Sequence, residues 1–253
     1  MNHALHRTGV AGDPASPIHR LDPRAKIVGL AGITLVGVST PLGAWPAFVA
    51  CALALAAIAA LARVGPAVVW SRVRVILPLV IFVAAFVPFV RGGPTVALGP
   101  LSLSEQGVQT FALVTAKAAI GAWSAVLLSA TTSFPDILHG LERLRVPRLL
   151  TVIAAFMYRY VFVIADEARR MRTALAARAY RPRHLGQVGA LGRMVTALFL
   201  RSYERGERVY LAMLARGYAG TMPRLAVLVF RRADTAFLAA LALTLLPLRV
   251  LAA

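Results

Sequence analysis

The sequence predicts an all-α integral membrane protein. We expect about five transmembrane helices, with long amphipathic cytoplasmic helices inserted between the fourth and the fifth. Three observations carry this prediction. Apolar residues make up 59% of the 253 residues, against roughly 45–50% in an ordinary soluble domain. These residues fall into runs long enough to cross a bilayer. Residues 133–232, which lie between two of the runs, hold most of the arginines.

Residues 1–26 precede the first apolar run and are predicted to form a cytoplasmic N-terminal segment. They are polar and contain prolines and glycines, and no small-residue cleavage site follows a short apolar core, so they do not resemble a cleaved signal peptide. Asp22 and Pro23 stand just before the apolar run, in the order expected of a helix N-cap and first turn. The alternative is a contact between Asp22 or Arg24 and the cytoplasmic helices.

Residues 27–62 are almost wholly apolar and predict the first two spans. The run has 36 residues, and about 20 suffice for one crossing. Pro41 and Gly43 lie near its middle, where a tight turn is needed. We therefore expect helices at roughly 27–41 and 45–62.

Three further apolar runs predict the remaining spans, at 75–90, 108–130 and 236–253. Pro78 lies within the first of them, and proline is tolerated in a spanning helix when neighbours satisfy the freed backbone groups. Residues 91–106 contain Gly-Pro breaks and predict a loop. The expected parts are an N-terminal segment, four spans, an Arg-rich coupling domain and a last span, at 1–26, 27–131, 132–232 and 233–253.

The basic residues set the orientation in the membrane. With the N-terminus in the cytoplasm, the inner segments carry nearly all of them, including eighteen arginines between 131 and 235. The short outer loops carry only Arg91. This arrangement obeys the positive-inside rule. Residues 147–165 are apolar enough for a sixth span, but that span would place the later arginines outside. We expect 147–165 at the membrane–cytoplasm boundary instead.

The Arg-rich region is predicted to form amphipathic helices, because its charged and apolar residues fall on opposite faces at helical spacing. On 199–217 one face gathers Phe199, Tyr203, Gly206, Tyr210, Met213 and Gly217, and the opposite face gathers Arg201, Arg205, Arg208 and Arg216. On the preceding helix one face gathers Val161, Ile164, Ala168, Met171 and Leu175, and the other gathers Arg159, Asp166 and Arg170. Pro182 is expected to end that helix.

Three interpretations compete for this basic surface. One is a solvated face attracted to anionic lipid. Another is nucleic-acid binding, which is disfavoured because stacking platforms and a known basic motif are missing. The last is a docking surface for a soluble partner with acidic pockets, to which the arginine fork is suited. Charge and period alone leave the lipid and docking interpretations open.

Two motifs resemble the signatures of a known family. Residues 202–218 resemble the second signature of the CbiQ/EcfT family, in which a cytoplasmic helix ends in Ala-Arg-Gly. The matching residues here are Ala215, Arg216 and Gly217. About 38 residues upstream, Ala177, Arg178 and Ala179 resemble the first signature. Other similar segments are 19–26, 131–133, 144–147 and 158–159.

The resemblance implies the transmembrane T component of an energy-coupling factor transporter, closest to the cobalt-type members. Two cytoplasmic ATPase subunits would each accept one signature helix in a groove, and a separate membrane protein would capture the substrate. Arg178 and Arg216 would anchor the two grooves. The supporting contacts on the apolar faces would come from Met171, Leu175, Tyr210 and Met213. The chain itself would need no cofactor and would hydrolyse no ATP, since it has no Gly-rich phosphate loop.

The two signatures differ in their third residue. Gly217 is expected at a helix C-terminus that needs a positive φ. Ala179 stands where the family usually has glycine, and alanine is strained in that conformation. The first signature helix is therefore free to continue to Pro182, which would change the geometry at its end and leave the role of Arg178 intact.

Lys117, Cys51 and the five histidines are further candidates for function. Lys117 lies inside the fourth predicted span, where a charge is a functional candidate, with snorkelling or pairing to a backbone carbonyl as the alternative. Cys51 is expected to be a small buried hydrophobe. No two of the five histidines stand four residues apart on an apolar helix, so we expect no metal site. The five are His3, His6, His19, His139 and His184.

Two other functions are alternatives to an energy-coupling scaffold. A self-contained channel or secondary carrier would be favoured by inverted repeats or by polar residues at mid-bilayer, and only Lys117 fits. A membrane enzyme would need acids or histidines clustered near an interface, and the ten acidic residues are scattered. The identity of the metal or vitamin would be set by the partner that captures it.

Overall fold

The computed structural model describes residues 13, 15–41, 44–84, 95–98, 101–178, 180, 189–220 and 229–251. The chain divides into two compact units. Unit 1 comprises Met1–Val146 and Val229–Ala253, and unit 2 is Pro147–Leu228.

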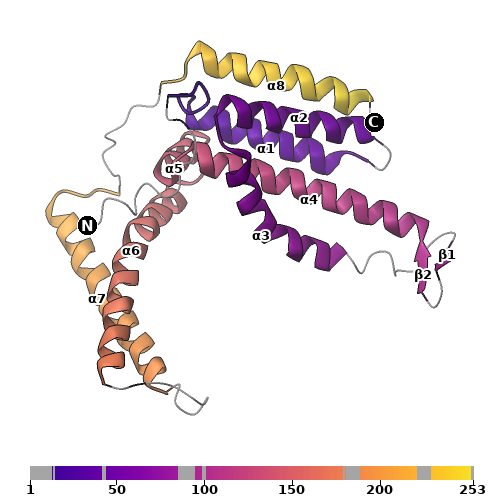
Figure 1. The fold of residues 1–253 in the computed structure, drawn as a ribbon. Helices are drawn as coiled ribbons and strands as arrows, with labels where there is room; N and C mark the ends of the chain where they lie inside the picture. Colours follow the sequence, from indigo (N-terminus) through magenta and orange to yellow (C-terminus); the bar gives the residue numbers. More distant parts are fainter. Residues whose placement is uncertain are drawn as a thin grey trace. The chain divides into compact units, whose positions relative to one another are not determined.

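Unit 1 is a bundle of long helices built around α1 (Figure 1). Its helices are α1 (Pro23–Ser39), α2 (Trp45–Leu61), α3 (Pro66–Ala84), α4 (Glu105–Thr131), α5 (Phe134–Arg143) and α8 (Arg232–Leu251). α1 contacts α2, α4, α5 and α8, and α3 packs on α4. Ile33, Leu55 and Leu127 are fully buried, one each on α1, α2 and α4. Cys51 is also buried, as expected of a small hydrophobe.

The apolar runs in the sequence predict the positions of most of these helices. α1 and α2 match the predicted pair at 27–41 and 45–62 within a few residues. α3 begins at Pro66, nine residues before the predicted start, because Pro66 at the first turn begins the helix and apolar residues follow it at helical spacing. α4 and α8 also begin a few residues earlier than their apolar runs.

The predicted loop at 91–106 is wrong for part of its length. Thr95–Leu98 (β1) and Leu101–Ser104 (β2) form an antiparallel hairpin, with Leu98 opposite Leu101. The segment alternates Val and Leu with small or hydroxyl side chains, which favours strands, and the Gly-Pro pair between the strands is the turn signal that suggested a loop. α4 then starts at Glu105. Apart from this hairpin, the regular structure in the described residues is helical.

Two described helices are long and apolar enough to cross a membrane. They are Gln109–Thr131 within α4 and Arg148–Ala177, which is α6. α2 is apolar but shorter. This test uses length and composition alone, so the count of five spans stays a prediction. The placement of 147–165 at the membrane boundary also stays a prediction.

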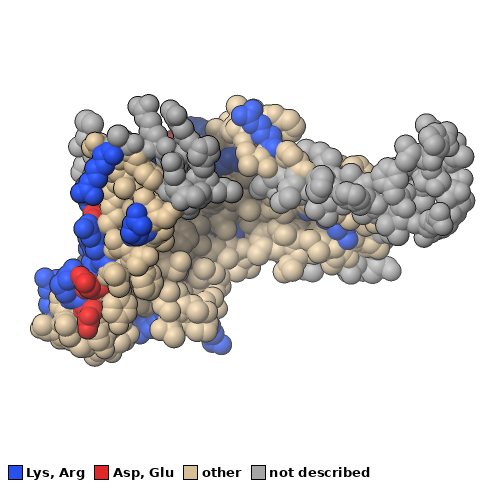
Figure 2. All heavy atoms as spheres, turned by 90° about the horizontal axis from the view of Figure 1, so that it is seen from below, with Lys and Arg blue, Asp and Glu red and all other residues tan. Residues whose placement is uncertain are grey.

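Unit 2 contains two long helices that lie side by side, α6 (Arg148–Ala177) and α7 (Gly189–Ala215) (Figure 1). Charged side chains gather on this part of the chain. In the view of Figure 2 many of the Lys and Arg side chains, with a few acidic ones, lie on α6 and α7. The described surface of the long unit 1 helices is mostly uncharged in that view.

The start of α1 confirms the predicted cap. Asp22 is the N-cap, its side chain accepts a hydrogen bond from Arg24 N at 2.9 Å, and Pro23 occupies the first turn. The cap satisfies one of the backbone donors that a helix N-terminus leaves unpaired. The same helix approaches α8 closely at Gly29, where an added Cβ would lie 2.8 Å from Phe237 Cε1 and 2.9 Å from Leu241 Cδ1.

This close approach gives a stability prediction. Gly29→Ala should lower the free energy of unfolding by about 1–3 kcal/mol, because overpacking a close contact forces side chains to shift. Gly32→Ala is the matched control on the same helix, since nothing lies within 4 Å of its added Cβ. Thermal unfolding in detergent measures both. Equal midpoints for the two variants would contradict the packing of α1 on α8.

Candidate coupling site

The C-terminal end of α7 carries the second signature in a closed cap. Arg216 follows the last helical residue, Ala215. Gly217 has φ +81°, as its position predicted, and its N–H donates to Leu214 O at 2.9 Å. Tyr218 N donates to Met213 O at 3.0 Å. These two bonds are the pair that defines a Schellman motif, so the helix stops sharply and leaves the Arg216 side chain exposed.

The end of α6 carries the first signature and repeats part of this geometry. Arg178 is the C-cap residue, exposed, with φ −88° and ψ 24°. Tyr180 N donates to Leu175 O at 3.1 Å, the bond equivalent to the one from Tyr218. The prediction that the helix continues to Pro182 is wrong, because this bond closes the helix after Ala177. Ala179 lies outside the described residues.

α6 and α7 pair in opposite directions, which separates the two arginines. Glu167 Oε1 on α6 accepts from Arg201 Nη1 on α7 at 2.6 Å, near the middle of each helix. Arg178 lies on one side of this ion pair and Arg216 lies at the other end of the helix pair. At 1.5 Å of rise per residue, the 11 residues from Glu167 to Arg178 and the 15 residues from Arg201 to Arg216 place the two arginines on the order of 40 Å apart. The two arginine-bearing helix ends are therefore well separated within unit 2.

A groove of about 340 Å³ lies between α6 and α7. Its lining is mainly apolar and aromatic and consists of Phe156, Tyr160, Ile164, Ser202, Arg205, Gly206, Val209, Tyr210, Met213 and Tyr218. Tyr210 and Met213, two of the predicted supporting residues, thus face α6. The other two, Met171 and Leu175, are half-buried on α6.

The predicted faces of α7 are partly wrong. Arg205 was placed opposite the apolar face but lines the groove. Phe199 and Tyr203 were placed on the packed face but are each 67% exposed. The helix is rotated so that the side that carries Ser202 and Val209 faces α6. Part of the apolar face of α7 is therefore left uncovered within unit 2.

Most of the chain, including both of these helix ends, matches a known protein family. The family model CbiQ, described as "Cobalt transport protein", matches residues 14–227. That stretch includes both signatures and more than half of the chain. This chain belongs to the CbiQ family.

Individual relatives agree with the family. The cobalt transport protein CbiQ of Rhodobacter capsulatus is 30% identical over 76% of this chain and 78% of its own length. The energy-coupling factor transporter transmembrane protein EcfT of Listeria innocua is 27% identical over 89% of this chain and 90% of its own. A putative ABC transporter ATP-binding protein of Bifidobacterium longum is 32% identical over 82% of this chain. This chain spans only 28% of that relative's length and 36% of another long relative's.

Lys117 has a structural partner in the CbiQ-family chain. Its Nζ donates to Val38 O in the last turn of α1 at 2.7 Å. Carbonyls in a last turn have no helical partner, so the ammonium satisfies one of them and links α4 to α1. This is the backbone pairing that was the alternative to a functional role, and a function for Lys117 stays a prediction.

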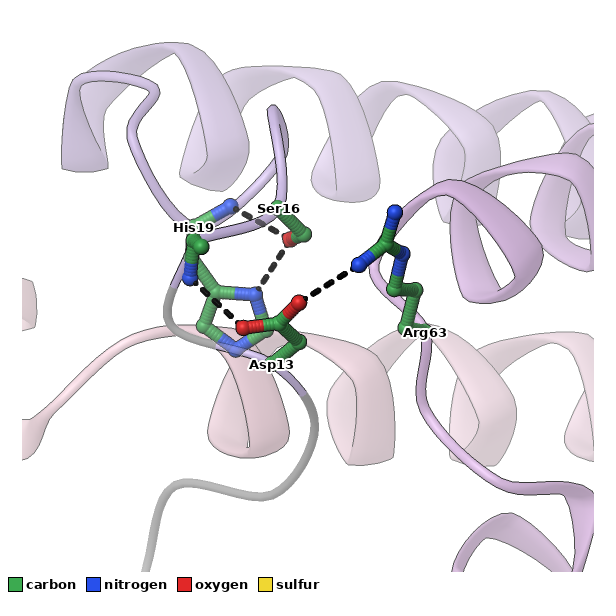
Figure 3. A network of polar contacts seen from close by, with 5 residues as sticks. Asp13, Ser16, His19 and Arg63 are labelled. Atoms are coloured by element: carbon green, nitrogen blue, oxygen red, sulfur yellow. Dashed lines mark hydrogen bonds and ion pairs between the residues drawn. The ribbon is translucent and has the colours of Figure 1, made fainter.

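Polar contacts join Asp13, just before the first helix of the CbiQ-family chain, to Arg63 just after α2 (Figure 3). Asp13 Oδ2 accepts from Arg63 Nη1 at 2.7 Å, and Asp13 Oδ1 accepts from Ala15 N at 2.9 Å. The Ala15 N–H and the Arg63 guanidinium hold the pKa of Asp13 below its usual value, so its carboxylate is charged at neutral pH. Ser16 Oγ lies 2.7 Å from His19 Nδ1. In the described residues no three His, Cys, Asp or Glu side chains gather as metal ligands.

The ion pair between the two signature helices gives the next prediction. Glu167→Gln should loosen α7 on α6 and speed amide hydrogen exchange in α7, because Arg201 loses its carboxylate partner. Asp166→Asn is the control, since Asp166 pairs with Arg169 on its own helix at 3.2 Å. Hydrogen exchange read by mass spectrometry distinguishes the two. Equal exchange in α7 for both variants would show that the interhelical pair contributes nothing.

Proposed function

We propose that this chain is the energy-coupling transmembrane subunit of an ATP-driven importer for cobalt or nickel. It passes the motion of two cytoplasmic ATPase subunits to a separate membrane protein that captures the substrate. The chain hydrolyses no ATP itself and binds no cofactor. Its surroundings are the lipid bilayer of the cytoplasmic membrane, with the N-terminus inside.

The observation that carries this proposal is the pair of capped helix ends. Arg178 and Arg216 occupy the same position, immediately after the last helical residue, and a tyrosine two residues later closes each helix. A shared geometry at two distant points suits two copies of one partner. The relative named for an ATP-binding protein supports a partner of the ABC type.

The charges of the two arginines support docking over lipid attraction. Both side chains are exposed, and no acidic residue among the described ones forms an ion pair with either guanidinium. A helix end that carries a free guanidinium can enter a groove and pair with a carboxylate there through two parallel hydrogen bonds. Attraction to anionic lipid would need only net charge, without matched caps.

The proposal predicts the outcome of a pull-down from detergent. Wild-type chain, co-expressed with the ATPase subunits of a cobalt-type transporter, should retain them in stoichiometric amount. Arg178→Ala and Arg216→Ala should each weaken retention by roughly 10-fold or more, since losing one partner of a charge-assisted pair costs 2 kcal/mol or more. The double variant should retain no ATPase.

Two matched control variants distinguish specific binding by Arg178 and Arg216 from attraction by net positive charge. Arg172→Ala on α6 and Arg193→Ala on α7 each remove one exposed arginine and should leave retention unchanged. If all four single variants lose equal amounts of ATPase, the arginines act only through net charge. If the wild type retains no ATPase, the secondary carrier becomes the better hypothesis.

A further inference from the structure

An apolar groove of about 590 Å³ lies between α2, α3 and α4 of unit 1. α4 packs against both of the other helices, so the groove belongs to a single bundle. Small side chains such as Ala60 of α2 and Ala119 of α4 leave the space open, and Val73 of α3 lines it. The volume is within the roughly 300–1,000 Å³ that is usual for ligand sites.

One polar group on a residue that lines the groove lacks a partner. Trp123 lines the groove from α4, and its indole nitrogen is buried with no hydrogen-bond acceptor among the described residues. An indole N–H can only donate, and a buried donor without an acceptor is costly in apolar surroundings. An occupant that brings an oxygen acceptor into this groove would therefore satisfy Trp123 after a small rotation of its ring.

Trp70 and Arg74 of α3 lie at the rim of the groove. Trp70 lines it and is 63% exposed. Arg74 is four residues later, on the same side of the helix, and it is exposed, with no ion pair to an acidic side chain among the described residues. Two other arginines nearby are engaged, since Arg63 is in an ion pair and Arg72 donates to a serine hydroxyl. An exposed indole beside a guanidinium is typical of protein surface at the level of lipid headgroups.

The size and chemistry of the groove favour a lipid over a protein segment. A helix with its side chains is about 10–12 Å across, so a piece only roughly 5–8 Å long would fill the 590 Å³. An acyl chain is thinner and can lie along the groove. The ester oxygens next to the chain are acceptors of the kind that Trp123 lacks, and a phosphate can pair with the Arg74 fork through two hydrogen bonds.

We propose that the groove between α2, α3 and α4 binds one anionic glycerophospholipid. An acyl chain lies against Ala60, Val73 and Ala119, an ester oxygen accepts from Trp123, and the phosphate pairs with Arg74. The bound lipid fills space that the three helices leave between them and so joins α3 to α2 and α4. The site includes none of the signature residues and does not depend on the proposed function.

The chain has three tryptophans, which allows a direct test. Trp45→Phe and Trp70→Phe leave Trp123 as the only tryptophan in the full chain, which is reconstituted in phosphatidylcholine vesicles that contain increasing amounts of dibrominated phosphatidylglycerol or dibrominated phosphatidylcholine. Bromine quenches indole fluorescence on contact. Quenching of Trp123 should saturate, and half-quenching should need about fivefold less of the anionic lipid, the effect of one arginine near a headgroup. Arg74→Gln should abolish this difference.

Matched variants control for general effects of size and charge. Ala60→Leu and Ala57→Leu add the same side chain at exposed positions of α2, and only Ala60 lines the groove. Ala60→Leu should therefore abolish the difference between the lipids, whereas Ala57→Leu and Arg143→Gln on α5 should preserve it. If Ala60→Leu fails to fold, the Arg74→Gln variant decides.

Two outcomes would overturn the proposal. Quenching that follows the mole fraction of both lipids equally would show only the ordinary lipid that surrounds any membrane protein. Loss of the saturable quenching when the chain is reconstituted with the substrate-capture protein of a cobalt-type transporter would show that a protein occupies the groove. The assay needs no ATPase, so its result is separate from that of the pull-down.

Discussion

The burial of Lys26 at the start of α1 is the constraint on which unit 1 depends. An ammonium removed from water costs several kcal/mol unless hydrogen bonds replace its hydration. Here the replacements are carbonyls of His19 and Thr131, which come from the N-terminal segment and from the end of α4. One side chain thus sets the positions of three parts of the chain. Asp234 adds α8 to the same point through the backbone of Asp22.

In unit 2, backbone hydrogen bonds at the helix ends define the structure more than buried side chains do. α6 and α7 have exposed surfaces along most of their length, and few of their residues are buried. Their ends are nevertheless sharply defined, because the backbone bonds from Tyr180 and Tyr218 close each helix. Helix ends that are closed by backbone bonds and exposed to solvent are accessible to a binding partner.

Much of this organisation could be predicted from the sequence. Apolar runs located α1, α2, α4 and α8, because hydropathy reports directly on which segments are buried or in lipid. The Asp22 cap and the positive φ of Gly217 were predictable because each depends on a few adjacent residues. The arginines of both signatures were identified by resemblance, and their role in binding stays a prediction.

The remaining features depend on contacts between distant segments. Nothing local marks Gly140 as the residue on which α5 rests against α1, or Asp234 as the partner of Asp22. The rotation of α7 that brings Arg205 into the groove depends on how α6 and α7 pack together. A prediction made from the sequence of α7 alone has no information about that packing. A proline predicts the end of α6 too late, because the backbone bond from Tyr180 N to Leu175 O stops the helix earlier.

The most direct measurement of the central claim is paired photo-crosslinking. A photoreactive residue is introduced in place of Arg178, of Arg216, or of both, in the chain co-expressed with the ATPases, and the products are weighed intact. The account predicts that each single variant crosslinks one ATPase subunit. The double variant should yield a product of one chain with two ATPase subunits, because the two helix ends are well separated within unit 2. Crosslinks to lipid alone, or a double variant that never carries more than one ATPase, would contradict it.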